Sequence, residues 1–246
     1  MTNRLRSAPP PRTMPPLSIE TLALPYCSAR VEWRRSTRAR RVSLRIDPRG
    51  GNVVVTLPPR AARSAGMALL TTHADWVASR LAALPDHVPL VDGAMVPING
   101  VPYCIRHVPQ HRGVAWIVEQ ELFVTGAPEF VRRRVIDFLR TEARRKLSGL
   151  AAAKAATIEA KPRRVVVKDT QSRWGSCAPD GSLAFSWRLI MAPEFVQDYV
   201  AAHEVAHLQH MNHGKRFWAL VDRLTPHTVA AVPWLRREGS RLLRIG

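Results

Sequence analysis

The five residues His203-Glu204-Val205-Ala206-His207 restrict the possible folds of this 246-residue chain more than any other segment. Four residues along an α-helix correspond to about 400° of rotation, so both imidazoles would emerge on one face about 6 Å apart and could share a tetrahedral ion. Glu204 is rotated by about 100° from His203 and falls beside such an ion. The pattern predicts a helix that carries two zinc ligands, with Glu204 as the general base.

A catalytic zinc site of this kind takes a third protein ligand and keeps one position open. We favour His213, because the asparagine and glycine that flank it would end the helix and turn the chain back toward the metal. Glu238 is the alternative, as a carboxylate from a later helix. The helix would carry His210 a turn further along, so we expect ordinary surface or capping roles for His210 and His227.

The first part of the chain is rich in strand patterns. Residues 1–20 carry repeated proline and few apolar residues, which predicts a disordered tail. Alternating apolar residues on both sides of the turn at 48–51 predict a hairpin, and three- and four-residue spacing over 61–84 predicts one helix. Short strand patterns follow at 103–105, 116–118 and 122–124. We therefore expect a small β-rich N-terminal domain with one helix over residues 21–126.

The pattern changes near residue 127, where a long helix with one buried stripe is expected, and we place the domain boundary there. Strands at 165–167 and 182–187, separated by a turn at 171–177, precede a helix over 193–211 and helical patterns at 215–224 and 232–243. No internal repeat is visible. The predicted class is α+β, with a mostly helical C-terminal domain over 127–246 that contains a short sheet.

The formal net charge of +18 comes almost entirely from arginine. Such a charge attracts polyanions, although a drift of the composition toward arginine and alanine would give the same total. The candidate surface for nucleic acid or another polyanion is the hairpin, and the arginines around it are Arg34, Arg35, Arg38, Arg40, Arg41 and Arg45.

The sequence also predicts the cellular location of the protein. It has no apolar run long enough for a membrane helix and no secretory signal, so we expect no membrane partner. Its three cysteines, Cys27, Cys104 and Cys177, are widely scattered, with no paired spacing that would suggest a disulfide framework. We expect a cytoplasmic protein.

Several segments together resemble a known family. Three runs carry the resemblance, from Ala202 to His207, from Met211 to Gly214 with Phe217-Trp218, and from Ser172 to Cys177. They closely resemble the YgjP-like zinc metallopeptidases, which are relatives of the SprT-like proteins. The arginine-rich hairpin, Pro58-Pro59 and His73-Ala74-Asp75-Trp76 extend the resemblance, which runs from about residue 31 to residue 243.

The resemblance implies a zincin-like C-terminal domain, with His203, His207 and His213 as zinc ligands and Glu204 as catalytic acid and base. It also implies a hydrolase that cleaves a peptide or protein substrate. Such a substrate could add as a further strand beside residues 173–177, which otherwise form a structural turn with a buried Trp174. We expect Tyr199 to be a core residue.

Two other functions remain open. The basic surface near a metal site suggests a metal-dependent nucleotide phosphoanhydride hydrolase, but no glycine-rich phosphate loop accompanies it. A nucleic-acid-associated protein with a mainly structural zinc site is the third possibility. Glu204 argues against it, because a structural site has no use for a general base and closes its fourth position with a ligand.

Overall fold

The computed structural model describes residues 18–170 and 173–246, which form six α-helices and three small β-sheets. The predicted α+β class is confirmed. Backbone contacts divide the described residues into two compact units, a first one that ends at Leu84 and a second one that begins at Pro85. Of the predicted disordered tail, residues 1–17 lie outside the described residues, whereas residues 18–20 belong to a strand.

The first unit is built on a four-stranded sheet in the order β1-β2-β4-β3, in which β2 and β4 are parallel and the other pairs are antiparallel. The predicted hairpin is confirmed, because β3 and β4 pair on either side of residues 48–51. The strands of this sheet are β1 (Ser18–Leu24), β2 (Cys27–Arg35), β3 (Ser43–Asp47) and β4 (Asn52–Leu57).

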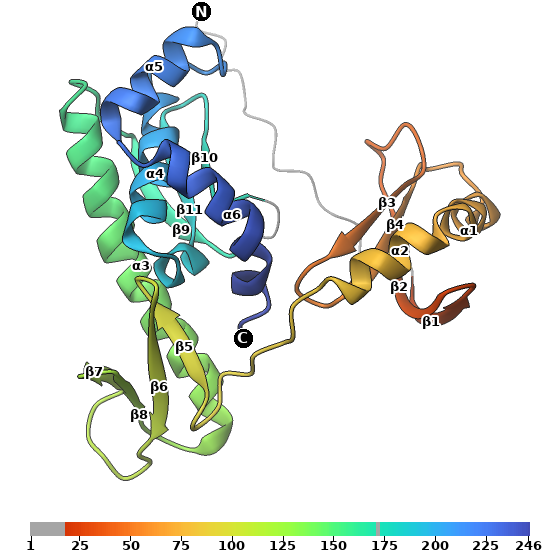
Figure 1. Ribbon diagram of the computed structural model, residues 1–246, viewed down its shortest axis with the longest axis horizontal. Helices are drawn as coiled ribbons and strands as arrows, with labels where there is room; N and C mark the ends of the chain where they lie inside the picture. Colours follow the sequence, from red (N-terminus) through yellow and green to blue (C-terminus); the bar gives the residue numbers. More distant parts are fainter. Residues whose placement is uncertain (1–17, 171–172) are drawn as a thin grey trace, which may run out of the picture. The chain divides into compact units, whose positions relative to one another are not determined.

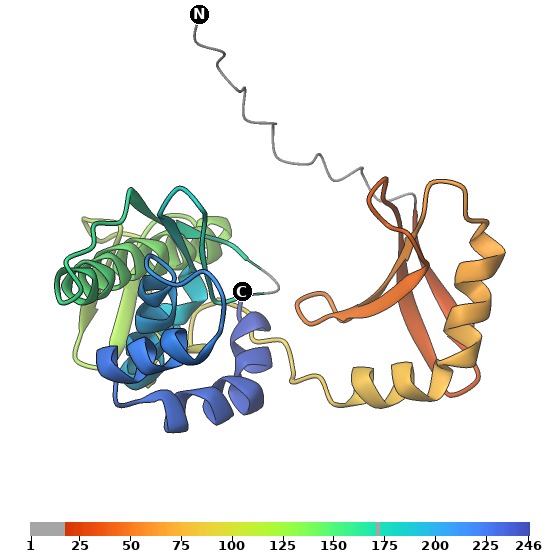
Figure 2. The same ribbon diagram turned by 90° about the horizontal axis from the view of Figure 1, so that it is seen from above.

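Two helices, α1 (Arg63–Thr72) and α2 (Ala74–Ala82), pack against this sheet (Figure 2). The single helix expected over 61–84 is interrupted at His73, whose φ of −110° and ψ of 23° leave the helical region. Alternate residues of the strands face the helices, as a half-buried sheet requires. The buried core of the unit consists of Ala29, Val31, Trp33, Val53, Val55, Leu57, Leu70 and Val77.

The second unit begins with a sheet of the same topology. Its order is β5-β6-β8-β7, again with parallel inner strands and two antiparallel outer pairs. In both sheets a seven-residue loop joins the second strand to the third, at 36–42 and at 108–114. This repetition is not visible in the sequence. The strands are β5 (Met95–Ile98), β6 (Val101–His107), β7 (Ala115–Val118) and β8 (Glu121–Val124).

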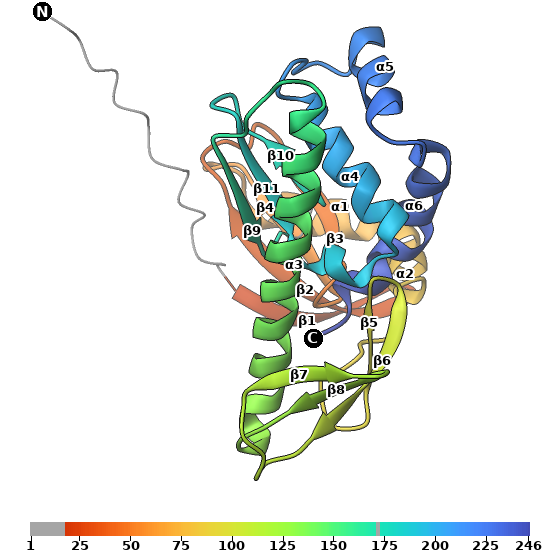
Figure 3. The same cartoon turned by 90° about the vertical axis from the view of Figure 1, so that its left-hand side faces the viewer.

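The expected long helix is α3 (Val131–Ala156). Its N-terminal part packs against β7 and β8, and the rest packs against later elements of the unit (Figure 3). Neither α3 nor any other helix of the described residues is long and apolar enough to span a membrane. The buried stripe of α3 repeats every four residues and consists of Val131, Val135, Leu139, Ala143, Leu147, Ala151 and Ala155.

The third sheet has the order β10-β11-β9, so the short strand β10 lies at one edge. Helix α4 packs against β10 and beside α3, which packs against β9 (Figure 1). The sheet contains β9 (Arg164–Lys168), β10 (Gly175–Cys177) and β11 (Ser182–Ser186). It is followed by the 3₁₀-helix η2 (Trp187–Met191) and by α4 (Glu194–Ala206), α5 (Lys215–Leu224) and α6 (Thr228–Leu243).

The structure places the division between the units after Leu84, not at residues 126 and 127 as expected. The reason is a shared core, since strands β5 to β8 bury Ile105 and Leu122 in the same apolar cluster as α3. The fully buried Gln197 of α4 also donates a hydrogen bond of 2.9 Å to the side chain of Asn99, in the turn between β5 and β6. The second sheet therefore belongs with the C-terminal helices.

Candidate metal centre

Helix α4 carries the first two histidines of the site. Pro193 precedes the helix, as is common at a first turn, and the helical residues end at Ala206 with His207 as the C-cap. The helix expected over 193–211 is therefore confirmed but shorter. The chain turns immediately after His207, because the N–H groups of the next residues bond to carbonyls of the last helical turn. This early turn lets the segment after the helix fold back over its end.

The returning segment brings His213 next to the two helix histidines. The ring centroid of His213 lies 5.1 Å from that of His203 and 4.7 Å from that of His207, and the two helix rings are 5.1 Å apart. One potential ligand nitrogen from each residue lies within 4.8 Å of the others. Over residues 18–170 and 173–246, no other group of three histidine, cysteine or acidic side chains converges in this way.

The ring nitrogens of these histidines suit a metal ion. Nδ1 of His207 lies 3.0 Å from the carbonyl oxygen of His210, to which it donates in the neutral tautomer, so Nε2 keeps its lone pair. The Nε2 atoms of His203 and His213 are 3.1 Å apart. Burial lowers the pKa of His203 to about 4, helped by the two neighbouring imidazoles, and burial also lowers the pKa of His207. Both helix imidazoles are therefore neutral at pH 7, which is the form that binds a metal.

The aromatic ring of Phe217 packs against all three imidazoles. Phe217, in the first turn of α5, is completely buried. Its ring centroid lies 5.0 Å from that of His203, 4.5 Å from that of His207 and 4.7 Å from that of His213. The sequence offered only its resemblance to a family motif as a signal for this residue.

Glu204 lies against the edge strand β10. Glu204 is 6% exposed, and this burial raises the pKa of its carboxyl group to about 7. The positive charge of Arg173 acts in the opposite direction and lowers this pKa. A Cβ atom at Gly175 would lie only 2.5–2.7 Å from Cγ, Cδ and Oε1 of Glu204. The carboxyl group therefore occupies the space that a side chain at position 175 would need. It does not belong to the converging group of ligand atoms.

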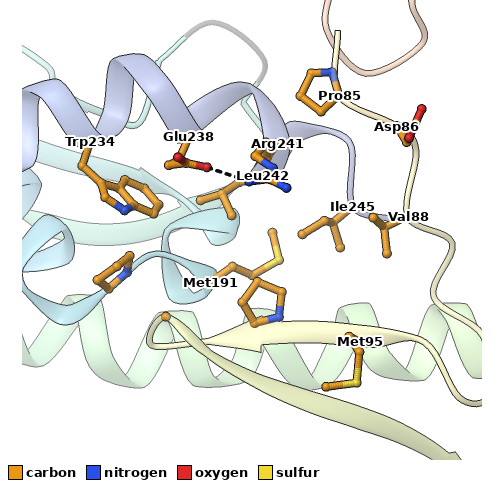
Figure 4. A pocket seen from close by; sticks show the side chains of 13 residues that line it. Pro85, Asp86, Val88, Met95, Met191, Trp234, Glu238, Arg241, Leu242 and Ile245 are labelled. Atoms are coloured by element: carbon orange, nitrogen blue, oxygen red, sulfur yellow. Dashed lines mark hydrogen bonds and ion pairs between the residues drawn. The ribbon is translucent and has the colours of Figure 1, made fainter.

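Glu238, the alternative third ligand, lies elsewhere. Its carboxylate forms ion pairs with Arg237 at 2.8 Å and Arg241 at 3.2 Å on α6. Together with Trp234 it lines a mostly apolar cavity of about 690 Å³ (Figure 4). Pro193 also lines this cavity. Pro193 stands at the beginning of α4 and the histidines at its end. The structure thus brings His213, and not Glu238, next to His203 and His207.

The remaining residues of interest have local roles. His210 contributes its carbonyl oxygen to His207, and His227 stands at the N-cap position of α6. Tyr199 is 6% exposed in the core, as expected, and burial raises its pKa. Of the predicted turn over 171–177, residues 171–172 lie outside the described residues and 175–177 form β10. Trp174 is partly buried against Gly239 of α6.

Comparison with known proteins gave one family and one solved structure. A model of the family described as "YgjP-like, metallopeptidase domain" matches residues 40–238. A search of curated proteins gave no match. A matching solved structure is the crystal structure of the metallopeptidase zymogen of Pyrococcus abyssi abylysin. It is 18% identical, covers 40% of this chain and 97% of its own, and has a TM-score of 0.34.

Proposed function

The chain belongs to the YgjP-like metallopeptidase family, whose model covers residues 40–238, and we propose that it is a zinc-dependent peptidase. In this proposal His203, His207 and His213 hold the zinc ion, and Glu204 is the general base. The observation that carries the proposal is the convergence of three imidazoles, two of them from the end of the helix that also carries the buried carboxyl group of Glu204.

The donor set fits zinc. Three imidazole ligands leave one coordination position open, which is typical of catalytic and not of structural zinc sites. When bound, zinc supplies a Lewis acid that polarises a carbonyl group and makes water ionisable at about pH 7. Phe217 restricts the movement of the three rings, since it contacts all of them from one side.

Glu204 would move the proton. Its carboxylate accepts a proton from the attacking water and then donates it to the leaving amine nitrogen of the cleaved peptide bond. In the metal-free site burial raises the pKa of this carboxyl group to about 7, which makes it a stronger base than an exposed glutamate. The carboxyl group has room for this role because position 175 carries no side chain.

The edge of β10 is the proposed binding place for the peptide. In the sheet as described, β10 pairs only with β11, so its other edge can form backbone hydrogen bonds with an extended peptide. This edge begins at Gly175, and the Glu204 carboxyl group lies next to that residue. A peptide bound along the edge would therefore pass close to Glu204. Backbone pairing holds a peptide in a fixed register without requiring a particular side chain.

The proposal is tested with zinc-loaded protein on a peptide library and a nucleotide panel in parallel. We expect peptide cleavage, and we expect Glu204→Gln to lower it by about 10²-fold or more while bound zinc, measured by mass spectrometry, stays unchanged. Glu238→Gln is the matched control and should cleave normally. Activity of the Glu204 variant within about tenfold of the original would refute the role of this residue. Glu204-dependent hydrolysis of nucleotides alone would favour the phosphoanhydride hydrolase.

A further inference from the structure

The first unit carries an unusual excess of positive charge. Its described residues, 18–84, contain eleven arginines, no lysine and only four acidic residues. Like charges at this density repel one another and destabilise a folded unit unless an anion matches them. The contacts of the individual arginines show which of them are already matched within the unit.

Three arginines stabilise the fold itself. Arg34 forms an ion pair of 2.6 Å with the buried Glu32. Arg63 pairs with Glu20 and lies over a tryptophan ring, at 4.7 Å from its centroid. Arg35 donates hydrogen bonds to backbone carbonyl oxygens of residues 58 and 61, at 2.9 and 3.1 Å. These arginines and two of the four acidic residues are therefore unavailable to a partner.

A second group of arginines is exposed and has no ion pair within the described residues. Three of them stand in the loop 36–42 between β2 and β3. The other two lie on β2 and β3, at positions that alternate with the buried residues and hence on the sheet face opposite α1 and α2. We call this group the basic surface, and it consists of Arg30, Arg38, Arg40, Arg41 and Arg45.

The second sheet shows that this charge is specific to the first. Residues 18–57, which form β1 to β4, contain eight arginines and three acidic residues. Residues 95–124, which form the same topology, contain two arginines and two acidic residues. A drift in composition would act on both segments of the same chain. The loop 108–114, equivalent to 36–42, has only Arg112.

We propose that the basic surface binds the phosphate backbone of duplex nucleic acid. The guanidinium group forms paired hydrogen bonds with phosphate, and charges spread over a loop and two strands suit a ligand with repeated phosphates. The loop 36–42 has no aromatic residue, and Trp33 of β2 is buried on the opposite face. Because this loop offers no aromatic ring on which exposed bases could stack, its arginines favour a duplex over a single strand, and their phosphate contacts carry no sequence preference.

The test measures binding of the full chain to a short fluorescent DNA duplex by anisotropy, from about 50 to about 200 mM salt. The variant Arg38→Gln, Arg40→Gln, Arg41→Gln removes three proposed phosphate contacts. Each contact adds about 0.9 to the slope of log affinity against log salt, so the slope should become shallower by about 2.7. Arg45→Gln alone should change it by about 0.9. Thermal melting verifies that each variant is folded.

The control variant removes the same charge from exposed positions of the second unit, as Arg112→Gln, Arg132→Gln, Arg144→Gln. It should leave the slope unchanged. An equal effect of both triple variants would overturn the proposal in favour of diffuse charge. Absence of duplex binding at about 50 mM salt, or tighter binding to phosphatidylserine vesicles or to a single strand, would also overturn it. Because the readout is binding, failure here is distinct from failure of the proposed peptidase activity.

Discussion

Gly175 has no side chain, and the carboxyl group of Glu204 lies where a side chain would be. A methyl group at this position would approach Cγ and Oε1 of Glu204 to 2.5 and 2.6 Å, and the surrounding core leaves that carboxyl group little room to move. Under the proposed function we expect Gly175→Ala to lower kcat by about 100-fold, because a displacement of about 1 Å in a catalytic group has an effect of that size. Bound zinc should remain, since no ligand is altered.

Gly149→Ala is the matched control for this substitution. Gly149 lies in α3, and a Cβ atom there would have no neighbour within 4 Å. Replacement in a helix interior should stabilise the protein by up to about 1 kcal/mol and leave cleavage unchanged. If Gly175→Ala cleaved peptides as well as the control, Glu204 would not depend on the space at position 175.

His213 and His210 provide a second comparison at this scale. His213→Ala removes one of three converging imidazoles and should weaken zinc binding by at least about 10²-fold, because two protein ligands rarely hold this ion. His210→Ala should have little effect, since His210 contributes only a carbonyl oxygen to His207. Zinc retained equally by both variants during dialysis against a mild chelator would place the third ligand elsewhere.

The four residues proposed for the site could be predicted from the sequence because local rules govern them. Helical periodicity places His203, Glu204 and His207, and the glycine after His213 favours a turn back to the helix. The contact of Gly175 with Glu204 joins residues that are distant in the chain. Spacing along a sequence holds no information about such a contact.

Helix α5 contacts the site through Phe217 and Trp218 of its first turn, and the ring centroid of Trp218 lies 5.8 Å from those of His203 and His213. Phe217 is completely buried and contacts the three imidazole rings. Phe217→Ala should lower the free energy of unfolding by about 3–5 kcal/mol through lost packing, and it should weaken zinc binding because the rings gain freedom. Phe217→Leu keeps most of the volume and should cost less than about 1.5 kcal/mol. Thermal unfolding with and without zinc measures both effects. If both variants bound zinc as tightly as the original protein, Phe217 would only fill the core.

Element boundaries departed from the sequence patterns where local and tertiary effects compete. The apolar spacing over 61–84 is continuous, yet the backbone leaves the helical region at His73 and two helices cover the sheet. Helix α6 begins at Thr228, before the predicted start at 232, and it contains Pro233 within its length. A proline inside a helix removes one backbone hydrogen bond, so a prediction from sequence places Pro233 at the beginning of the helix and not within it. Packing of α6 against α4 outweighs that loss.

At the scale of the whole molecule, the sequence predicted a β-rich part and a helical part but not their division. Strand patterns between residues 103 and 124 suggested continuity with the first hairpin, because a change in pattern was the only visible marker of a boundary. The structure repeats one sheet topology on both sides of Leu84, and the second copy packs its apolar face on α3. Which core a strand joins depends on contacts across the chain, and these leave no periodic signal.

The division after Leu84 can be tested by truncation. Residues 85–246 contain the complete apolar cluster around α3, so we expect this fragment to unfold cooperatively and to bind one zinc ion. Residues 127–246 lack β5 to β8, which would expose part of the buried stripe of α3 and remove one of the hydrogen bonds of the buried Gln197 amide, the one to Asn99. We therefore expect the shorter fragment to aggregate or to unfold without a cooperative transition in calorimetry. A soluble, cooperative and zinc-binding fragment 127–246 would instead show that the C-terminal helices form a domain without the second sheet.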